Sequence, residues 1–259
     1  MTVIASWNIN SIRIRLELIE KLLKKIEPDI VLFQEIKCTN GDFPNFFENF
    51  GYKAIVNGQK GKYGTAVIFK EKIHVDEVEI HDDFLNKESR TNLIYIKKLD
   101  LNILNVYTPN GNPISNKEKF DFKISWLQKI KKLSKKFIDN NKNLLIAGDF
   151  NVIEEIQDVR NFPDWENDAL GHFVTREKFR EILSTGLTNI VRLFNAPGSK
   201  YSFWDYQRAC WERNDGLLID HFLMSPRYVS NVKKIRFESD FRGFPKPSDH
   251  IPIWIDLNI

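Results

Sequence analysis

Residues 144–152 have the sequence LLIAGDFNV. A short apolar run bounded by a glycine and polar residues is typical of a strand buried on both faces. Asp149 and Asn151 follow this run two positions apart, so in an extended chain both side chains point to one face. A carboxylate beside a buried strand is costly unless a cation or hydrogen-bond donors compensate it. The stretch therefore predicts a buried strand that delivers polar side chains to a functional site.

Other apolar strands also meet carboxylates, carboxamides or a histidine at one end. These residues are Asn8 and Asn10 after Ile4–Trp7, Glu35 after Ile30–Gln34, Asp220 after Leu217–Ile219, and Asp249 and His250 before the final strand. Each alone has a structural interpretation, such as a helix cap, a turn anchor, an ion pair or a partly buried histidine. Because sites are commonly assembled where strand ends and loops meet, their coincidence favours one shared site. An all-oxygen set of Glu, Asp and Asn suits Mg²⁺ or Mn²⁺ rather than Zn²⁺.

Strand-like and helix-like segments alternate along the chain, without a linker or repeat. Periodicity predicts helices at Ile12–Ile26 and Thr175–Leu183, and a capping box of Ser115 and Glu118 predicts a long helix to about Asn140. Several neighbouring strands lack a helix between them, which indicates a mixed sheet or two packed sheets with helices outside. We expect an α/β fold in a single domain, residues 1–259. Strands are expected at Thr2–Trp7, Asp29–Gln34, Thr65–Phe69, Asn92–Ile96, Leu101–Tyr107, Asn143–Ala147, Leu217–Leu223 and Ile251–Leu257.

Composition is that of an ordinary soluble globular protein, with 42% hydrophobic and 28% charged residues. No apolar run approaches the roughly 20 residues of a membrane span, and no secretory signal is visible. Cys38 and Cys210 are too few for a disulfide framework and do not form a metal-binding pair. We therefore expect an intracellular, cytoplasmic protein that is not secreted and does not bind a membrane.

Net charge is +3, which is compatible with a polyanionic partner without requiring one. The clearest basic run is KIKKLSKK, residues 129–136, in a segment whose apolar residues recur at helical spacing. Its favoured interpretation is the solvated face of an amphipathic helix, and the alternative is a nucleic-acid patch.

Six short motifs carry a resemblance that extends from residue 3 to residue 257. In order they are WNIN (7–10) with Arg13, QEIK (34–37), YTPNG (107–111), GDFNV (148–152), IDH (219–221) and PSDHIP (247–252). Together they resemble the motifs of the exonuclease III family of AP endonucleases. The resemblance implies a DNase I-like fold, which is a four-layer α/β sandwich of two packed mixed sheets flanked by helices.

The activity that the resemblance implies is that of a DNA-repair phosphodiesterase in base excision repair. Such an enzyme cleaves the backbone 5′ to abasic sites, as a class II AP endonuclease, and also has 3′-5′ exonuclease and 3′-end-trimming activity. Its cofactor would be Mg²⁺, with Mn²⁺ as the substitute. Its partner would be double-stranded DNA with abasic sites or blocked 3′ ends, and nothing in the sequence requires more than a monomer.

The resemblance also implies catalytic roles. Asp149 resembles the residue that activates the attacking water, and Asn151 the residue that positions it. His250 is similar to a histidine that contacts the scissile phosphate, with Asp220 as its orienting carboxylate, and Tyr107 is expected near the phosphate. The implied metal ligands are Glu35 as principal ligand, Asn8, Asp149, Asn151 and Asp249.

Substrate contacts are implied at two places. Asn10, Arg13, Lys37 and Asn110 are expected at the DNA by motif position. The aromatic segment that follows Tyr201 resembles a loop and pocket that receive an extruded baseless sugar, which implicates Phe203, Trp204 and Leu217. The alternative for Phe203 and Trp204 is that they are core residues, since aromatic side chains mostly pack.

One departure concerns Leu218, where many relatives carry a basic residue. The departure predicts the loss of a DNA-backbone contact or of a fold-stabilising contact at this position. Two further functions stay open. One is a phosphodiesterase of the same fold acting on phospholipid headgroups or inositol phosphates, and the other is a DNA-binding module that has lost catalysis.

Overall fold

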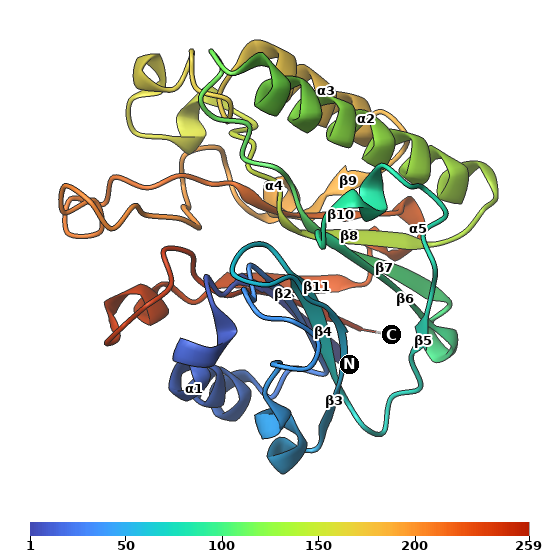
Figure 1. Cartoon of the computed structure of the whole chain (residues 1–259). Helices are drawn as coiled ribbons and strands as arrows, with labels where there is room; N and C mark the ends of the chain where they lie inside the picture. The colour runs from blue at the N-terminus through green and yellow to red at the C-terminus, as the bar shows by residue number, and fades with distance from the viewer. Residues whose placement is uncertain (259) are drawn as a thin grey trace.

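The computed structural model describes residues 1–258 and contains two six-stranded sheets that pack face to face (Figure 1). In spatial order the first sheet contains β11 (Val232–Phe237), β12 (Ile253–Leu257), β1 (Thr2–Asn8), β2 (Ile30–Gln34), β4 (Thr65–Lys70) and β3 (Tyr52–Asn57). The second contains β5 (Asp76–Glu77), β6 (Thr91–Ile96), β7 (Leu101–Tyr107), β8 (Leu144–Asp149), β10 (Asp220–Met224) and β9 (Thr188–Asn189).

Both sheets are mixed. The pairs β1–β2 and β7–β8 are parallel, and the other pairs are antiparallel. β1 therefore lies between β2 and β12, with Thr2 opposite Leu257. Because these pairs are parallel, the carboxyl ends of β1 and β2 lie side by side at one end of the first sheet, and those of β7 and β8 lie side by side at one end of the second.

Helices cover the outer faces of both sheets. Figure 1 shows α1 against the first sheet and α2 and α3 against the second, which confirms the expected four-layer α/β arrangement. The helices are α1 (Leu16–Ile26), α2 (Lys117–Asp139), α3 (Phe173–Leu183), α4 (Ile190–Phe194) and α5 (Pro226–Val229). Short 3₁₀ turns are η1 (Ile12–Ile14), η2 (Asn45–Phe50), η3 (Leu85–Lys87), η4 (Lys97–Leu99), η5 (Ile156–Asp158), η6 (Phe162–Asp164) and η7 (Ser239–Gly243). No helix among residues 1–258 is long and apolar enough to span a bilayer.

The main core fills the space between the sheets. Ile4 and Leu32 of the first sheet and Leu145 and Phe222 of the second belong to one cluster of buried side chains. Two further clusters lie beneath α1 and beneath α2 and α3. Since β2 is buried at every position, its unbroken apolar run follows from having both faces covered.

Two helix starts differ from the sequence prediction. The helix expected from Ile12 begins at Leu16, because residues 12–14 form the turn η1. The capping box predicted at Ser115 is wrong. The N-cap of α2 is Asn116, whose side chain accepts a hydrogen bond from the Lys119 amide at 3.2 Å.

Strand boundaries were predicted best in the sheet centres. The strand expected from Leu217 begins at Asp220, because Leu217 instead forms isolated bridges with Phe203 and Val159. The strand expected from Ile251 begins at Ile253. Strands β3, β11, β5 and β9 were not predicted. They are the sheet edges, where charged and polar residues interrupt the apolar pattern.

Two buried side-chain amides join the sheets near the carboxyl ends of the parallel strands. Asn105 of β7 lies within hydrogen-bond distance of the Phe33 and Ala66 carbonyl oxygens, at 3.0 and 3.2 Å. Gln34 of β2 donates to Asn105 Oδ1 at 2.7 Å and to Ser6 Oγ at 3.1 Å. Because buried polar groups are costly when unpaired, these bonds fix the register of one sheet on the other.

We expect Asn105→Leu to lower the free energy of unfolding by about 3 kcal/mol, because it leaves Gln34 and backbone carbonyls without their partner. Asn102→Leu, on the same strand, is the control, since Asn102 donates only to the Asn143 carbonyl at 3.0 Å. It should cost about 1 kcal/mol. Urea denaturation measures both, and equal losses would contradict a special role for Asn105.

Candidate active site

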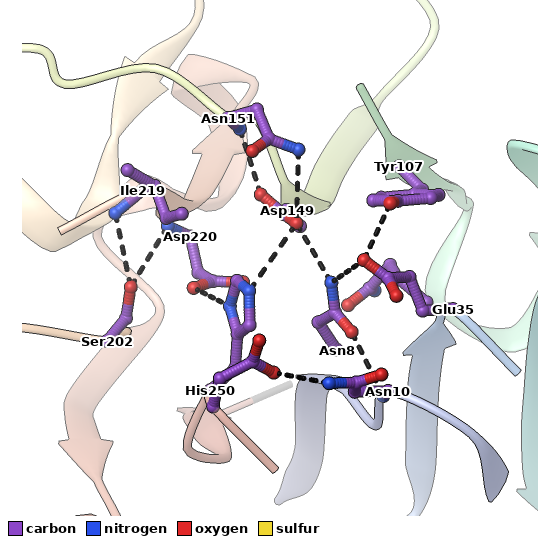
Figure 2. A network of polar contacts seen from close by, with 12 residues as sticks. Asn8, Asn10, Glu35, Tyr107, Asp149, Asn151, Ser202, Ile219, Asp220 and His250 are labelled. Carbon is purple, nitrogen blue, oxygen red and sulfur yellow. Dashed lines mark hydrogen bonds and ion pairs between the residues drawn. The ribbon is translucent and has the colours of Figure 1, made fainter. Parts of the chain in front are cut away.

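The predicted polar strand ends do converge, at the seam between the two sheets (Figure 2). Asn8, the last residue of β1, donates from Nδ2 to Asp149 Oδ2 of β8 at 2.9 Å. The same amide lies 3.3 Å from Glu35 Oε1. Asn8 thus bridges a carboxylate of each sheet.

Two carboxylates flank one imidazole at the centre. His250 Nδ1 lies 2.8 Å from Asp220 Oδ2, and His250 Nε2 lies 3.7 Å from Asp149 Oδ2. All three side chains are at most 5% exposed. Ser202 Oγ accepts hydrogen bonds from the amides of Ile219 and Asp220, which fixes the start of β10.

This burial shifts two pKa values. Burial alone would lower the pKa of His250, but Asp220 and Asp149 raise it to about 10, so the imidazole is protonated at neutral pH. Burial raises the pKa of Asp149 to about 7 against the opposing charge of His250, and Asp220 adds to the rise. Asp149 can therefore take up or release a proton near neutral pH, which suits a general base.

Asn151 reaches this centre by a turn, so the prediction of an extended Asp149–Asn151 segment is wrong. Asn151 has a φ of 49°, in the left-handed region. Its amide donates to Asp149 Oδ1 at 2.9 Å, and its Nδ2 lies 3.3 Å from Asp149 Oδ2. A side-chain-stabilised turn brings the two residues together.

Glu35 forms the other side of the site. Its Oε1 accepts the Tyr107 hydroxyl at 2.6 Å, and its Oε2 pairs with Lys37 Nζ at 2.9 Å. Although burial opposes the shift, Lys37 and Tyr107 lower the pKa of Glu35, which is therefore ionised. Burial, with Glu35 and Asp149 adding to it, raises the pKa of Tyr107 well above its usual value, so its phenol remains a donor.

A divalent cation fits this donor chemistry at Glu35. Among residues 1–258 no three His, Cys, Asp or Glu side chains gather closely enough to hold a metal ion by themselves. Mg²⁺ does not need such a cage, since it usually binds through one or two carboxylates together with water and phosphate oxygens. Glu35 and Asp249 line the same cavity, so two acidic side chains face the space in which a cation could bind. Asn8 uses its amide nitrogen to bridge carboxylates, and its Oδ1 accepts the Asn10 amide at 3.1 Å.

A cavity of about 360 Å³ opens above this network. Phe203, Leu217 and Ile219 form an apolar part of its wall. Phe203 also contacts the His250 ring edge-on, at 5.0 Å between centroids. The remaining lining residues are Glu35, Tyr107, Asn110, Asn112, Asn151, Trp165, Asp168, Leu170, Asp205 and Asp249.

Trp204 does not line this cavity. It is 3% exposed and packs edge-on against Trp211, at 4.9 Å. Its indole nitrogen lies 3.3 Å from Asn214 Oδ1. The structure therefore brings Phe203 and Leu217 to the site and places Trp204 inside the loop that carries Phe203.

The predicted DNA contacts separate into two kinds. Arg13 and Asn110 are exposed, and Asn110 Nδ2 lies 3.4 Å from Asn151 Oδ1. Lys37 and Asn10 belong to the polar network, because Lys37 pairs with Glu35 and donates to Asn10. Asn10 also donates to Asp249 Oδ1 at 3.0 Å.

Leu218, whose departure predicts the loss of a contact, lies in the protein interior. It is 1% exposed and belongs to the core between the sheets. A side chain at this depth stabilises the fold by apolar packing and does not reach solvent or DNA.

Sequence reasoning missed Lys123 of α2, which is fully buried beneath the site. Its Nζ donates to the carbonyl oxygens of Asn110 at 2.9 Å, Asn151 at 2.6 Å and Ala169 at 3.0 Å. Burial lowers its pKa to about 7, and Asp168 and Asp149 oppose that shift. The sequence did contain an indication of this burial. Lys123 precedes the buried Trp126 and Leu127 by three and four residues, so it lies on the same, inward-facing side of the helix.

We expect Lys123→Met to lower the free energy of unfolding by about 3 kcal/mol or more, because three backbone acceptors lose their donor. Lys135→Met is the control on the same helix, since Lys135 is exposed and pairs only with Asp139. Urea denaturation compares them. A Lys123→Met protein as stable as the control would show that this lysine does not hold the loops.

A second buried network lies behind Asn151. His221 Nε2 lies 3.3 Å from the Val152 carbonyl, and its Nδ1 lies 3.2 Å from Asn189 Nδ2. Arg192 donates to Glu154 Oε2 at 2.6 Å and also to Asp158. Burial, followed by the charge of Arg192, lowers the pKa of His221 to about 4, so it is neutral in the folded protein.

We expect His221 to make the fold sensitive to acid. Its pKa falls from 6.5 to about 4 on folding. Below pH 6.5 the unfolded chain binds a proton that the folded protein does not, so stability is lost as pH falls toward 4. The loss attributable to His221 is about 3 kcal/mol. In urea denaturation at pH 7 and pH 4, His221→Gln should show a correspondingly smaller decrease than the unsubstituted protein, and an identical decrease would count against this assignment.

Comparison with known proteins agrees with this geometry. A sequence model described as the Endonuclease/Exonuclease/phosphatase family matches residues 5–250. The chain is 30% identical to Exodeoxyribonuclease III of Haemophilus influenzae over 265 residues, covering 97% of this chain and 98% of that protein. It is 28% identical to the Exodeoxyribonuclease of Bacillus subtilis, with 98% of each chain covered.

Solved structures match equally completely. The AP endonuclease from Archaeoglobus fulgidus superposes with a TM-score of 0.93 at 29% identity, covering 100% of both chains. A variant of the 3′ phosphatase NExo from Neisseria, bound to product DNA hairpin, gives a TM-score of 0.90 at 27% identity, again over 100% of both chains. The expected DNase I-like sandwich is thereby confirmed.

Proposed function

This chain belongs to the exonuclease III family of AP endonucleases, within the endonuclease/exonuclease/phosphatase family, and we propose that it hydrolyses the DNA backbone 5′ to abasic sites. The observation that carries the proposal is the buried Asp149–His250–Asp220 group beneath a small, partly apolar cavity. The carboxylates and imidazolium supply the chemistry of phosphodiester hydrolysis, and the cavity supplies the selection of the damaged nucleotide.

In the proposed reaction, Asp149 accepts a proton from the attacking water. Asn151, held to Asp149 by two hydrogen bonds, orients that water. The water oxygen forms a bond to phosphorus while the bond from phosphorus to the 3′-oxygen breaks. The 3′-oxygen takes up a proton from solvent, which leaves a 3′-hydroxyl and a 5′-phosphate. Proton acceptance by a positioned base contributes roughly 10²–10⁴-fold.

His250 would act as a fixed positive charge. Because Asp220 and Asp149 keep it protonated, its imidazolium can stabilise negative charge that accumulates on the phosphoryl oxygens. Asp220 fixes the ring through Nδ1 and leaves Nε2 toward Asp149. A charge held in place before the reaction needs no rearrangement during it.

A divalent cation, Mg²⁺ or Mn²⁺, would be held by Glu35, with Asp249, Asn8 and Asn151 as the neighbouring oxygen and amide groups. When bound, it neutralises phosphate charge and stabilises the leaving oxygen. Tyr107 and Lys37 keep Glu35 ionised and oriented for this role.

Selection of abasic sites would come from the apolar wall. Phe203, Leu217 and Ile219 line a cavity of about 360 Å³, which suits a flipped deoxyribose without a base. Arg13 and Asn110, both exposed, are the proposed contacts to the DNA backbone. The same site would remove blocking groups and nucleotides from 3′ ends, since these reactions also cleave a phosphate ester at a 3′-oxygen.

The direct test compares a duplex carrying one abasic-site analogue with an intact duplex, in Mg²⁺ and in EDTA. We expect incision 5′ to the lesion in Mg²⁺, none in EDTA, and little cutting of the intact strand. Equal cutting of both duplexes would contradict the role of the apolar wall. If a folded sample fails to incise with either Mg²⁺ or Mn²⁺, the substrate assignment is wrong, and phospholipid or inositol-phosphate hydrolysis should then be measured.

We expect Asp149→Asn to reduce the rate of incision by about 10²–10⁴-fold, because the base is lost, while the fold is retained. Asp121→Asn removes an exposed carboxylate from α2 and serves as the control. Steady-state incision and thermal denaturation measure both variants. Full activity of Asp149→Asn would refute its assignment as the base.

A further inference from the structure

A groove of about 460 Å³ lies between the C-terminal half of α2 and residues 78–85. It is larger than the catalytic cavity and shares no lining residue with it. Its apolar lining consists of Val78, Ile80, Leu85, Leu93, Leu133 and Phe137.

The basic run at residues 129–136 borders this groove, and its lysines fall into two groups. Three of them have acidic partners at 2.9 Å: Lys129 with Asp82, Lys131 with Glu181 and Lys135 with Asp139. Lys132 and Lys136 form no ion pair with any residue in the range 1–258, and both line the groove. Lys142, also without an ion pair there, lines the same groove.

The uncompensated lysines give the groove a net positive rim. Lys132 and Lys136 are four residues apart and so lie on one face of α2, where like charges destabilise a helix by a few tenths of a kcal/mol. Of the two acids of the groove, Asp82 is paired with Lys129 and Glu79 is exposed to solvent, so the four lysines of the lining still outnumber the acids. A ligand that carries negative charge would relieve this repulsion.

The groove is also rigid on the side opposite α2. Asp82 accepts hydrogen bonds from the amides of Phe84 and Leu85 at 3.0 and 3.1 Å, and its other oxygen holds Lys129. The segment is therefore fixed to the helix before any ligand arrives. A preformed groove loses less entropy on binding than a flexible one.

We propose that this groove docks an extended acidic segment of a partner protein, with its apolar side chains on the floor and its carboxylates at Lys132 and Lys136. Because these lysines are four residues apart on the helix, they are separated by about 6 Å along its axis. Alternate residues of an extended peptide are separated by about 6.6 Å. Alternating acidic residues would therefore match the two lysines.

A protein segment fits this groove better than nucleic acid does. Phosphate contacts need cations but no apolar floor, whereas protein interfaces combine an apolar centre with a polar rim. The C-terminal half of α2, which borders the groove, also lies toward the opposite end of the second sheet from the carboxyl end of β8 (Figure 1). Lys136 is thirteen residues beyond Lys123 on α2, or about 20 Å along the helix. An occupant here leaves the catalytic cavity free.

The test is fluorescence anisotropy with a labelled synthetic peptide in which aspartate alternates with phenylalanine or leucine. We expect the unsubstituted protein to bind this peptide, and K132E/K136E to weaken the binding at least tenfold. Replacing the apolar residues of the peptide with glycine should weaken it similarly. Incision of abasic DNA should be the same in K132E/K136E as in the control below.

The control is K53E/K233E, which makes the same change in net charge at exposed lysines of β3 and β11. It should bind the peptide as the unsubstituted protein does. Equal loss in both double variants would mean that only net charge matters, and would overturn the proposal. It would also be overturned if the unsubstituted protein failed to bind, or if K132E/K136E selectively lost binding to duplex DNA, which would make nucleic acid the occupant.

Discussion

Two carboxylates that share one imidazolium away from water are the interaction on which the site depends. Asp149, Asp220 and His250 come from β8, β10 and the segment before β12, so the first sheet supplies the cation and the second supplies the anions. Removing the imidazolium would leave two buried carboxylates uncompensated, which is far more costly than losing a surface pair. The relative position of the two sheets is therefore most tightly constrained at the proposed catalytic centre.

Buried polar side chains around this centre hold in place the strands and loops that form it. Asn105 and Gln34 join the sheets beneath it, and Lys123 holds the backbone of the loops that carry Asn110 and Asn151. None of these three side chains is proposed to touch substrate. Their hydrogen bonds position residues that are proposed to touch substrate, which is how a site on strand ends and loops acquires a defined geometry.

The sequence predicted what local pattern determines and failed where tertiary contacts decide. Central strands such as β2 and β8 have unbroken apolar runs, so they and the polar residues at their ends, Glu35 and Asp149, were identified. The turn at Asn151 was missed because its conformation depends on a side-chain bond to Asp149. Lys123 was missed because a lysine is normally exposed, and only the folded loops provide its three acceptors. Edge strands were missed because half of their surface faces water.

The pairing of β1 with β12 has a consequence for biosynthesis. β1 occupies the interior of its sheet, and its neighbour β12 is made about 250 residues after it. Until β12 emerges from the ribosome, β1 has one open edge and His250 is absent from the seam. If His250 has the proposed role, a nascent chain cannot act as a nuclease, and its exposed strand edge is a surface that chaperones would need to shield during translation.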